Sequence, residues 1–288
     1  MEQEQSSYSS SSEERIRLGL QNYLLRLYDQ HLYEEIFKSL DSPAILDLGC
    51  FDGSVVLTRC DEFLESFTFL GLDNNPEVIE RMQEKYCDQD NINFEQMDVC
   101  VDDFDERLRE AMKSHSIEGF DLIHISLLLL HLPQPLDLLK KLRHFLKPDG
   151  RIFIKDSDDT QTCVEPDENG EFARIIKMCD HYDFTGNRHF ANKIGSLLEE
   201  AGYSNVKKRN SFITTDGLDK QHKELFWQFY FRELCYKGIQ KMLHKFPEDE
   251  LYSVEYEWFN DNYVRLFRKF MEEETRAQIG YPIFIANK

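Results

Sequence analysis

Short apolar runs alternate along the middle of the chain with segments whose apolar positions repeat at helical spacing. The apolar runs that we expect to form strands are AILDLG from Ala44, TFLGLD to Asp73, INFEQMD to Asp98, FDLIHIS from Phe120 and RIFIKD from Arg151. Val78, Met82 and Tyr86 form a helical stripe after Pro76, a residue that suits a first helical turn. This alternation predicts an α/β fold with a parallel, doubly wound sheet.

The rest of the chain divides by composition and pattern. NVKKRNSFIT and YPIFIANK are predicted as the sixth and seventh strands. The ranges that we expect are a disordered polar head (1–12), one or two N-terminal helices forming a cap (13–42), the core with its ligand site (43–216), a helical insertion that caps the substrate (217–279) and the last strand (280–288).

The turn after the first strand carries the strongest chemical signal. In AILDLGCFDGS, Gly49 and Gly53 leave bare backbone that can approach a ligand, and the amides of the next helix point into the same space. Asp73 ends the next strand and lies 73 − 53 = 20 residues after Gly53. A carboxylate at this spacing typically contacts ribose hydroxyls. Phe51 and Ser54 stand where a dinucleotide fingerprint needs glycines, and the Lys-Ser/Thr pair of a P-loop is absent.

The segment DLGCFDG resembles motif I of class I S-adenosylmethionine-dependent methyltransferases, with Phe51 in place of the middle glycine. The string FDLIHISLLLLHLPQPLDLLKKLRHFLKPDGRIFI also resembles the family's segment from strand four to strand five, so the resemblance covers roughly residues 44–156. It implies a seven-stranded, mostly parallel sheet whose last strand is antiparallel, S-adenosyl-L-methionine as cofactor and a methyltransferase activity of class EC 2.1.1.

The resemblance also implies roles for residues at the strand ends. Asp47 would anchor the turn and the cofactor's ammonium group, Asp73 would accept both ribose hydroxyls, and Asp98 would accept from the adenine amine. Any one of these could instead be a solvated strand end or a helix cap. The full cofactor-binding set expected along the turn and the strand ends is Asp47, Gly49, Cys50, Phe51, Gly53, Asp73, Asn74, Met97, Asp98, Val99 and Ser126.

Methyl transfer needs a general base only where the acceptor arrives protonated, and histidine is suited to that task. The candidates are His131 after strand four, Asp156 at the end of strand five, and His189, with His181 as a further candidate earlier in the same segment. For each histidine a structural, hydrogen-bonded role is the more common outcome. His124, inside the fourth strand, is expected to be buried.

The acceptor is narrowed by what the sequence lacks. The segment after strand four reads SLLLLH, without the Asn/Asp-Pro-Pro-Tyr/Phe motif that holds planar amines. The net charge of −20 disfavours nucleic acid. Aromatic residues of 217–279 could wall an acceptor pocket or could pack as core. We expect a small-molecule acceptor, and an aromatic or apolar one is compatible with the sequence. The alternatives are a protein or RNA substrate, or a catalytically silent relative.

Cysteine usage and hydropathy indicate the cellular compartment of the protein. The seven cysteines are scattered without a C-x-x-C pair, which indicates reduced thiols and suggests no metal site. The polar, acidic start is not typical of a signal or transit peptide, and no apolar stretch is long enough for a membrane span. These features favour a cytoplasmic enzyme without a membrane partner, and an oligomer is compatible with them.

Overall fold

The structure is a computed structural model that describes residues 12–288, with side chains from residue 16 onward. The predicted disordered head, residues 1–12, lies outside the described residues except for Ser12. The chain divides into two compact units. The core unit comprises Asp29–Ser157, Phe190–Ser211 and Tyr281–Lys288, and the helical unit comprises Met1–Tyr28, Asp158–His189 and Phe212–Gly280.

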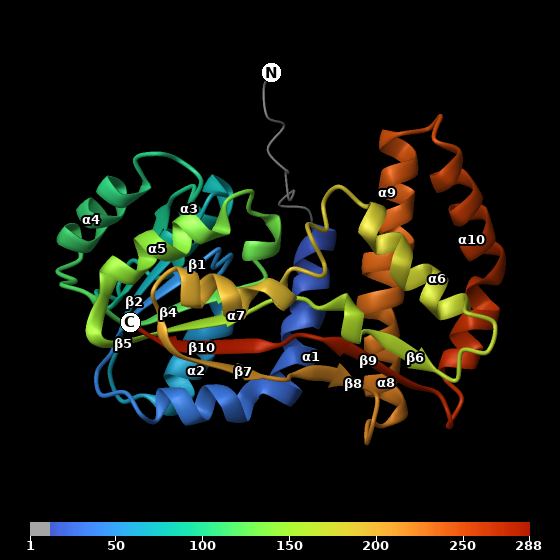
Figure 1. The fold of residues 1–288 in the computed structure, drawn as a ribbon, viewed down its shortest axis with the longest axis horizontal. Helices are drawn as coiled ribbons and strands as arrows, with labels where there is room; N and C mark the ends of the chain where they lie inside the picture. Colours follow the sequence, from blue (N-terminus) through green and yellow to red (C-terminus); the bar gives the residue numbers. More distant parts are fainter. Residues whose placement is uncertain (1–11) are drawn as a thin grey trace. The chain divides into compact units, whose positions relative to one another are not determined.

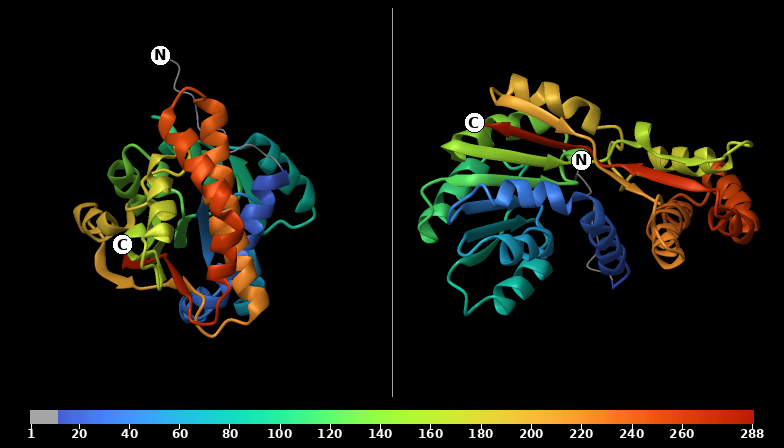
Figure 2. Two further views of the ribbon diagram at one scale, coloured as in Figure 1. Left: turned by 90° about the vertical axis from the view of Figure 1, so that its right-hand side faces the viewer. Right: turned by 90° about the horizontal axis from the view of Figure 1, so that it is seen from below.

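The core unit is built on one seven-stranded sheet of order β3-β2-β1-β4-β5-β10-β7 (Figure 1). Neighbouring strands pair in parallel except around β10, which runs antiparallel to both β5 and β7 (Figures 1 and 2). The bounds are β1 Ala44–Leu48, β2 Thr68–Asp73, β3 Ile92–Gln96, β4 Phe120–Ser126, β5 Leu146–Lys155, β7 Ser204–Arg209 and β10 Ile283–Asn287. The predicted fold class is confirmed.

Helices cover both faces of this sheet because alternate strand residues point to opposite sides. Ile45 of β1 packs in one apolar cluster with the end of α1 (Ser12–Phe37), with α2 (Ser54–Phe63) and with α3 (Pro76–Lys85). Leu46, the next residue, packs in a second cluster on the other face. The helices of that face are α4 Phe104–Ser114, α5 Pro135–Phe145 and α7 Ala191–Glu200.

The helical unit joins the first part of α1 to a helical array and a small antiparallel sheet of order β6-β9-β8. The strands are β6 Cys163–Glu165, β8 Phe212–Thr214 and β9 Arg276–Gly280. The longer helices are α6 Glu171–Met178, α8 Lys220–Phe226, the π-helix Trp227–Tyr236, α9 Lys237–Lys245 and α10 Glu250–Phe270. Short 3-10 turns are η1 Leu129–His131 in the core unit, and η2 Asp159–Gln161 and η3 Cys179–His181 in the helical unit.

Several element boundaries differ from the predicted ones. The predicted sixth strand is divided between β7 and β8, which belong to different sheets. The N-terminal segment, for which one or two helices were expected, forms one helix, α1. The range 43–216 assigned to the core includes residues 158–189, which lie in the helical unit, and the insertion 217–279 contains β9. The reason is that β6, β8 and β9 pair only with one another, a long-range choice that local patterning does not encode.

Strand β5 starts earlier than RIFIKD suggested. Phe120 pairs with Leu146 and Leu122 pairs with Arg151, so a step of two residues on β4 faces a step of five on β5. The predicted Pro148–Gly150 turn is accommodated as this irregularity within the strand.

The aromatic residues of the insertion pack against one another. Trp227 of the π-helix is 2% exposed, and its ring centroid lies 4.9 Å from that of Phe231 and 5.3 Å from that of Phe270. Phe267 and Tyr263 approach the same indole from α10, at 5.4 and 5.5 Å. These rings form the core of the helical unit, which is the second of the two interpretations that the sequence left open.

Candidate functional site

The turn after β1 folds tightly because three of its residues take left-handed backbone angles. Gly49 has φ +65°, Phe51 has φ +51° and Gly53, at the start of α2, has φ +68°. A phenylalanine in this region carries steric strain that a glycine would not. The half-buried Phe51 ring packs against the cluster formed by α1, α2 and α3.

Asp73 ties this turn to the next strand end. Its Oδ2 accepts a hydrogen bond from the Phe51 backbone amide at 2.8 Å, and its Oδ1 accepts one from the Asn75 amide at 3.0 Å. Burial raises the pKa of the Asp73 carboxyl, and these two amide bonds oppose the rise. The carboxylate thus lies at the carboxyl edge of the sheet, the edge at which folds of this class bind ligands.

Both motif glycines stand where a side chain would collide. A Cβ on Gly53 would lie 2.9 Å from Cζ of Phe94, and a Cβ on Gly49 would lie 3.2 Å from Cδ1 of Leu128. Cys50 is buried, and its Sγ would lie 2.8 Å from a Cβ placed on Gly71 of β2. Burial raises the pKa of the Cys50 thiol, so this cysteine is a packed side chain and a poor nucleophile.

The third strand end carries the remaining predicted contacts. The amide of Met97 donates to the Asp73 carbonyl at 2.9 Å, which holds the end of β3 beside that of β2. Asp98 is half-buried, and its Oδ1 accepts from the Cys100 amide at 2.9 Å. Asn74 is exposed, and Val99 packs against the α4–α5–α7 face. The structure therefore brings the ends of β1, β2 and β3 together as the sequence predicted.

Ser126 ends β4 and is in register with Lys155 of β5, and the next residue, Leu127, has φ +56°. This strained position at the carboxyl edge was not predicted, because leucine gives no sequence signal for a left-handed angle.

The Asp47 side chain is buried against His124, which differs from the expected contact with a cofactor ammonium group. The side chain is 3% exposed, and its Oδ1 lies 2.7 Å from Nδ1 of His124. His124 is buried as predicted, and its Nε2 lies 2.8 Å from the hydroxyl of Tyr33 in α1. The Tyr33 contact was missed because nothing in the sequence of α1 indicates which strand it covers.

Asp156, which follows β5, contacts the short turn that carries His131. The Leu130 amide donates to Oδ2 of Asp156 at 3.1 Å, and the Ser157 amide donates to Oδ1 at 2.8 Å. Asp156 thus fixes the short η1 turn that ends in half-buried His131. These bonds favour a positioning role for Asp156 and leave His131 as the candidate base on the core unit.

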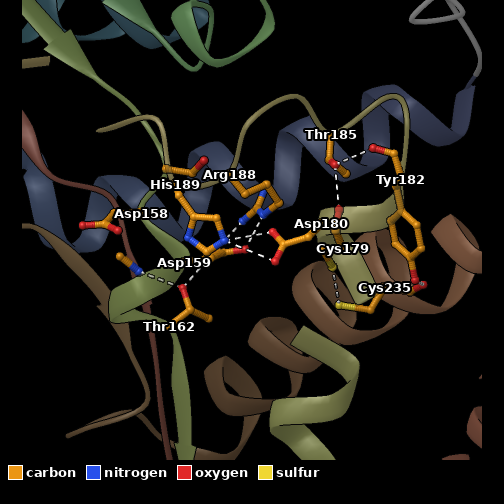
Figure 3. A network of polar contacts seen from close by, with 12 residues as sticks. Asp158, Asp159, Thr162, Cys179, Asp180, Tyr182, Thr185, Arg188, His189 and Cys235 are labelled. Carbon is orange, nitrogen blue, oxygen red and sulfur yellow. Dashed lines mark hydrogen bonds and ion pairs between the residues drawn. The ribbon is translucent and has the colours of Figure 1, made fainter. Parts of the chain in front are cut away.

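His189 belongs to the helical unit, where it is part of the polar network in Figure 3. Its Nε2 lies 3.0 Å from Oδ1 of Asp180, while the buried Nδ1 has no partner among the described residues. Beside it, Arg188 and Asp159 form a buried ion pair, with Nη2 and Oδ1 2.9 Å apart (Figure 3). His189 therefore contacts Asp180 within its own unit, and its predicted role in catalysis stays a prediction.

Comparison with known proteins identifies the family. A family model described as a methyltransferase domain matches residues 40–208, more than half of the chain. The chain belongs to the methyltransferase-domain family. The resemblance seen in the first motif is thereby confirmed. The matched residues include β1 to β5 of the core sheet and all of β7 but its last residue, and β10 lies beyond them.

Two curated relatives illustrate the range of similarity. A carboxy-S-adenosyl-L-methionine synthase of Helicobacter pylori is 30% identical over 129 residues, which are 43% of this chain and 47% of the relative, so the chain spans about half the length of that protein. A malonyl-[acyl-carrier protein] O-methyltransferase of Halalkalibacterium halodurans is 24% identical over 261 residues, 88% of this chain and 83% of the relative.

Among solved structures, the cyclopropane synthase MmaA2 of Mycobacterium tuberculosis has a TM-score of 0.50 and 14% identity, covering 90% of this chain and 84% of that one. This likeness concerns the fold. In residues 12–288, none of the helices has the length and apolar character needed to cross a membrane. The same part of the chain contains no cluster of histidine, cysteine and acidic side chains arranged to hold a metal ion.

Proposed function

We propose that this chain binds S-adenosyl-L-methionine over the turn after β1 and transfers its methyl group to a small-molecule acceptor. The observation that carries the proposal is Asp73, whose carboxylate is fixed by two backbone amides at the sheet edge beside the left-handed turn. The family model, which covers this whole region, supports it independently.

The residues present fit an adenosyl group. The Asp73 carboxylate accepts from the Phe51 and Asn75 amides at the sheet edge, and its oxygens are suited to accept from ribose hydroxyls as well. Gly49 and Gly53 supply the left-handed angles of the turn, and their Cβ positions are taken by the side chains of Leu128 and Phe94. The α2 amides that follow Gly53 add a favourable dipole for an anionic group such as a carboxylate.

When bound, S-adenosyl-L-methionine supplies a sulfonium-activated, electrophilic methyl group. The role of the protein is to hold and align the reacting groups and to exclude water, because proximity and orientation account for much of the barrier in a single displacement. Asp73 and Asp98 bind and orient, and Asp156 fixes the η1 turn on which His131 stands. His131 takes the acceptor's proton where the acceptor is a hydroxyl or a protonated amine.

A small-molecule acceptor is favoured by the names of the relatives. The H. halodurans relative is named a malonyl-[acyl-carrier protein] O-methyltransferase, and a relative from Actinobacillus pleuropneumoniae, named a ubiquinone biosynthesis O-methyltransferase, is 27% identical over 119 residues. The rings of 217–279 are used for packing, so they lend no support to an aromatic acceptor.

Calorimetric titration with S-adenosyl-L-methionine and S-adenosylhomocysteine tests the cofactor. We expect heat of binding with the intact chain, a large loss of affinity in Asp73→Ala, and an unchanged affinity in Asp88→Ala, an exposed carboxylate after α3. No heat with the intact chain would favour a catalytically silent relative.

Incubating cell extracts with the protein and isotopically methyl-labelled S-adenosyl-L-methionine, followed by mass spectrometry, tests the acceptor. Label in small metabolites is the expected outcome. Label confined to protein or RNA would support the alternative class of methyltransferase.

A further inference from the structure

Three polar residues occupy equivalent places on the three central strands of the core sheet. Asp47, His124 and Lys155 each follow by two residues an apolar side chain that packs under α1, namely Ile45, Leu122 and Phe153. Asp47 and His124 are direct register partners, and Lys155 is two residues beyond Phe153, the partner of His124. Because strand side chains alternate with period two, all three point to the α1 face.

Helix α1 closes over these side chains with polar groups of its own. The Tyr33 hydroxyl lies 2.8 Å from Nε2 of His124 and 3.4 Å from Nζ of Lys155. Asp29, one turn earlier, accepts from Nζ of Lys155 at 2.8 Å and from Nη2 of Arg59 in α2 at 2.9 Å. Each of these residues is at most 3% exposed.

Donors and acceptors in this buried network fit in one order only. The Lys155 ammonium donates to Asp29 and to the Tyr33 oxygen, so the Tyr33 proton is directed at Nε2 of His124. Nε2 is then an acceptor, and the ring proton must be on Nδ1, which donates to Asp47. Burial raises the pKa of the Tyr33 hydroxyl, which keeps that proton in place.

The charges of the network also balance. Asp29 and Asp47 are offset by Arg59 and Lys155, so the buried group is neutral when His124 is neutral. Burial lowers the pKa of the Lys155 ammonium, and the adjacent Asp29 carboxylate opposes this. Arg59 and Lys155 both contact Asp29, and the Asp47 carboxylate contacts His124.

We propose that the chain of hydrogen bonds from Lys155 through Tyr33 and His124 to Asp47 is a positioning device for the cofactor turn. It makes the second half of α1 part of the cofactor site, although α1 does not contribute to the turn itself. Asp47 lies two residues before Gly49. The hydrogen bond that holds its carboxylate therefore orients the end of β1, which leads into the left-handed turn. This inference rests on the proposed function, because it concerns the same cofactor.

The first test reads the ring of His124 without any ligand. Long-range ¹⁵N–¹H correlation spectra of ¹⁵N-histidine-labelled protein, assigned with a His124→Gln variant, report which ring nitrogen bears the proton. We expect a protonated Nδ1 and an acceptor Nε2 at neutral pH. A proton on Nε2 would overturn the proposal.

The second test compares two tyrosine-to-phenylalanine variants on the same helix. Tyr33→Phe removes the hydroxyl from the network, whereas Tyr28→Phe removes a hydroxyl that donates to the Thr214 carbonyl in the helical unit. We expect Tyr33→Phe to bind S-adenosylhomocysteine about tenfold more weakly, because a buried acceptor loses its donor.

Tyr28→Phe should bind S-adenosylhomocysteine as the wild type does. Equal affinities for Tyr33→Phe and the wild type would overturn the positioning role. Absence of binding by the wild type would overturn the proposed function itself, and the ring spectrum of His124 distinguishes that failure from a failure of the network.

Discussion

Single residues in the turn after β1 have both a conformational and a steric role. Phe51 adopts a left-handed angle at a cost that its ring packing and the Asp73 hydrogen bond offset. Gly53 has the same kind of angle and, in addition, no room for a Cβ. The cost of the left-handed angle and the cost of the steric contact can be separated, because Gly170 has the same angle and open space around its Cβ position.

Gly53→Ala should destabilise the protein by about 2–4 kcal/mol, from the left-handed angle and from overpacking against Phe94. Gly170→Ala is the matched control: Gly170 also precedes a helix with φ +68°, yet nothing lies within 4 Å of its Cβ position. It should cost only about 1–2 kcal/mol. Chemical denaturation of both variants measures the difference, and equal losses would show that Phe94 moves aside freely.

Tyr230 provides a substitution that should stabilise the protein. Its hydroxyl is buried in the helical unit and has no hydrogen-bond partner among residues 12–288. Tyr230→Phe should therefore stabilise the protein by about 1 kcal/mol, because an unsatisfied buried hydroxyl is removed.

The control for Tyr230 is Tyr182→Phe, since the Tyr182 hydroxyl donates to the Cys235 carbonyl at 2.9 Å and its loss should destabilise (Figure 3). Melting temperatures rank the three proteins. A lower melting temperature for Tyr230→Phe than for the wild type would mean that the hydroxyl has a partner in solution.

At the scale of elements, the strands and their order were predictable where the pattern is local. The runs from Ala44 to Asp156 alternate with amphipathic helices, and their register follows from burial on both faces. The β6-β9-β8 sheet was not predictable, because short strands separated by long segments pair through tertiary contacts. The Asp73 site was readable from glycine spacing, whereas the Tyr33–His124–Asp47 contacts depend on how α1 docks.

The carboxylate of Asp73 joins two elements, the turn after β1 and the start of α3, and its titration should be visible in binding. Its pKa is raised by burial, so as the pH falls towards the raised value the carboxylate takes up a proton and loses an acceptor for ribose hydroxyls. Affinity for S-adenosylhomocysteine should therefore weaken on acidification from pH 7 in the wild type.

Stability should respond to Asp73 with the opposite sign. A folded-state pKa above the unfolded one means that ionisation costs the folded state stability, and this cost increases as the pH rises from the unfolded to the folded pKa. Asp73→Asn should bind about tenfold more weakly at pH 7, because one acceptor is lost, and with a flatter pH profile. Calorimetry across pH tests this, and parallel profiles for the two proteins would assign the pH dependence to another group.

At the scale of the whole molecule, charge is the dominant feature. The chain has 54 acidic and 34 basic side chains, so 54 − 34 = 20 carboxylates have no basic counterpart. Their mutual repulsion opposes the compact state and is screened by salt, since the Debye length falls from about 30 Å at 0.01 M to about 8 Å at 0.15 M ionic strength.

Raising NaCl from 10 to 150 mM at pH 7.5 should therefore increase the melting temperature, and a gain of about 1 kcal/mol corresponds to about 2–4 °C for a chain of this size. Near pH 5, close to the isoelectric point of about 4.9, the net charge vanishes and the effect of salt should vanish with it. Differential scanning calorimetry at the two pH values makes the comparison. An equal rise at both would indicate salting-out of apolar surface, and a fall at pH 7.5 would mean that screened ion pairs outweigh the repulsion.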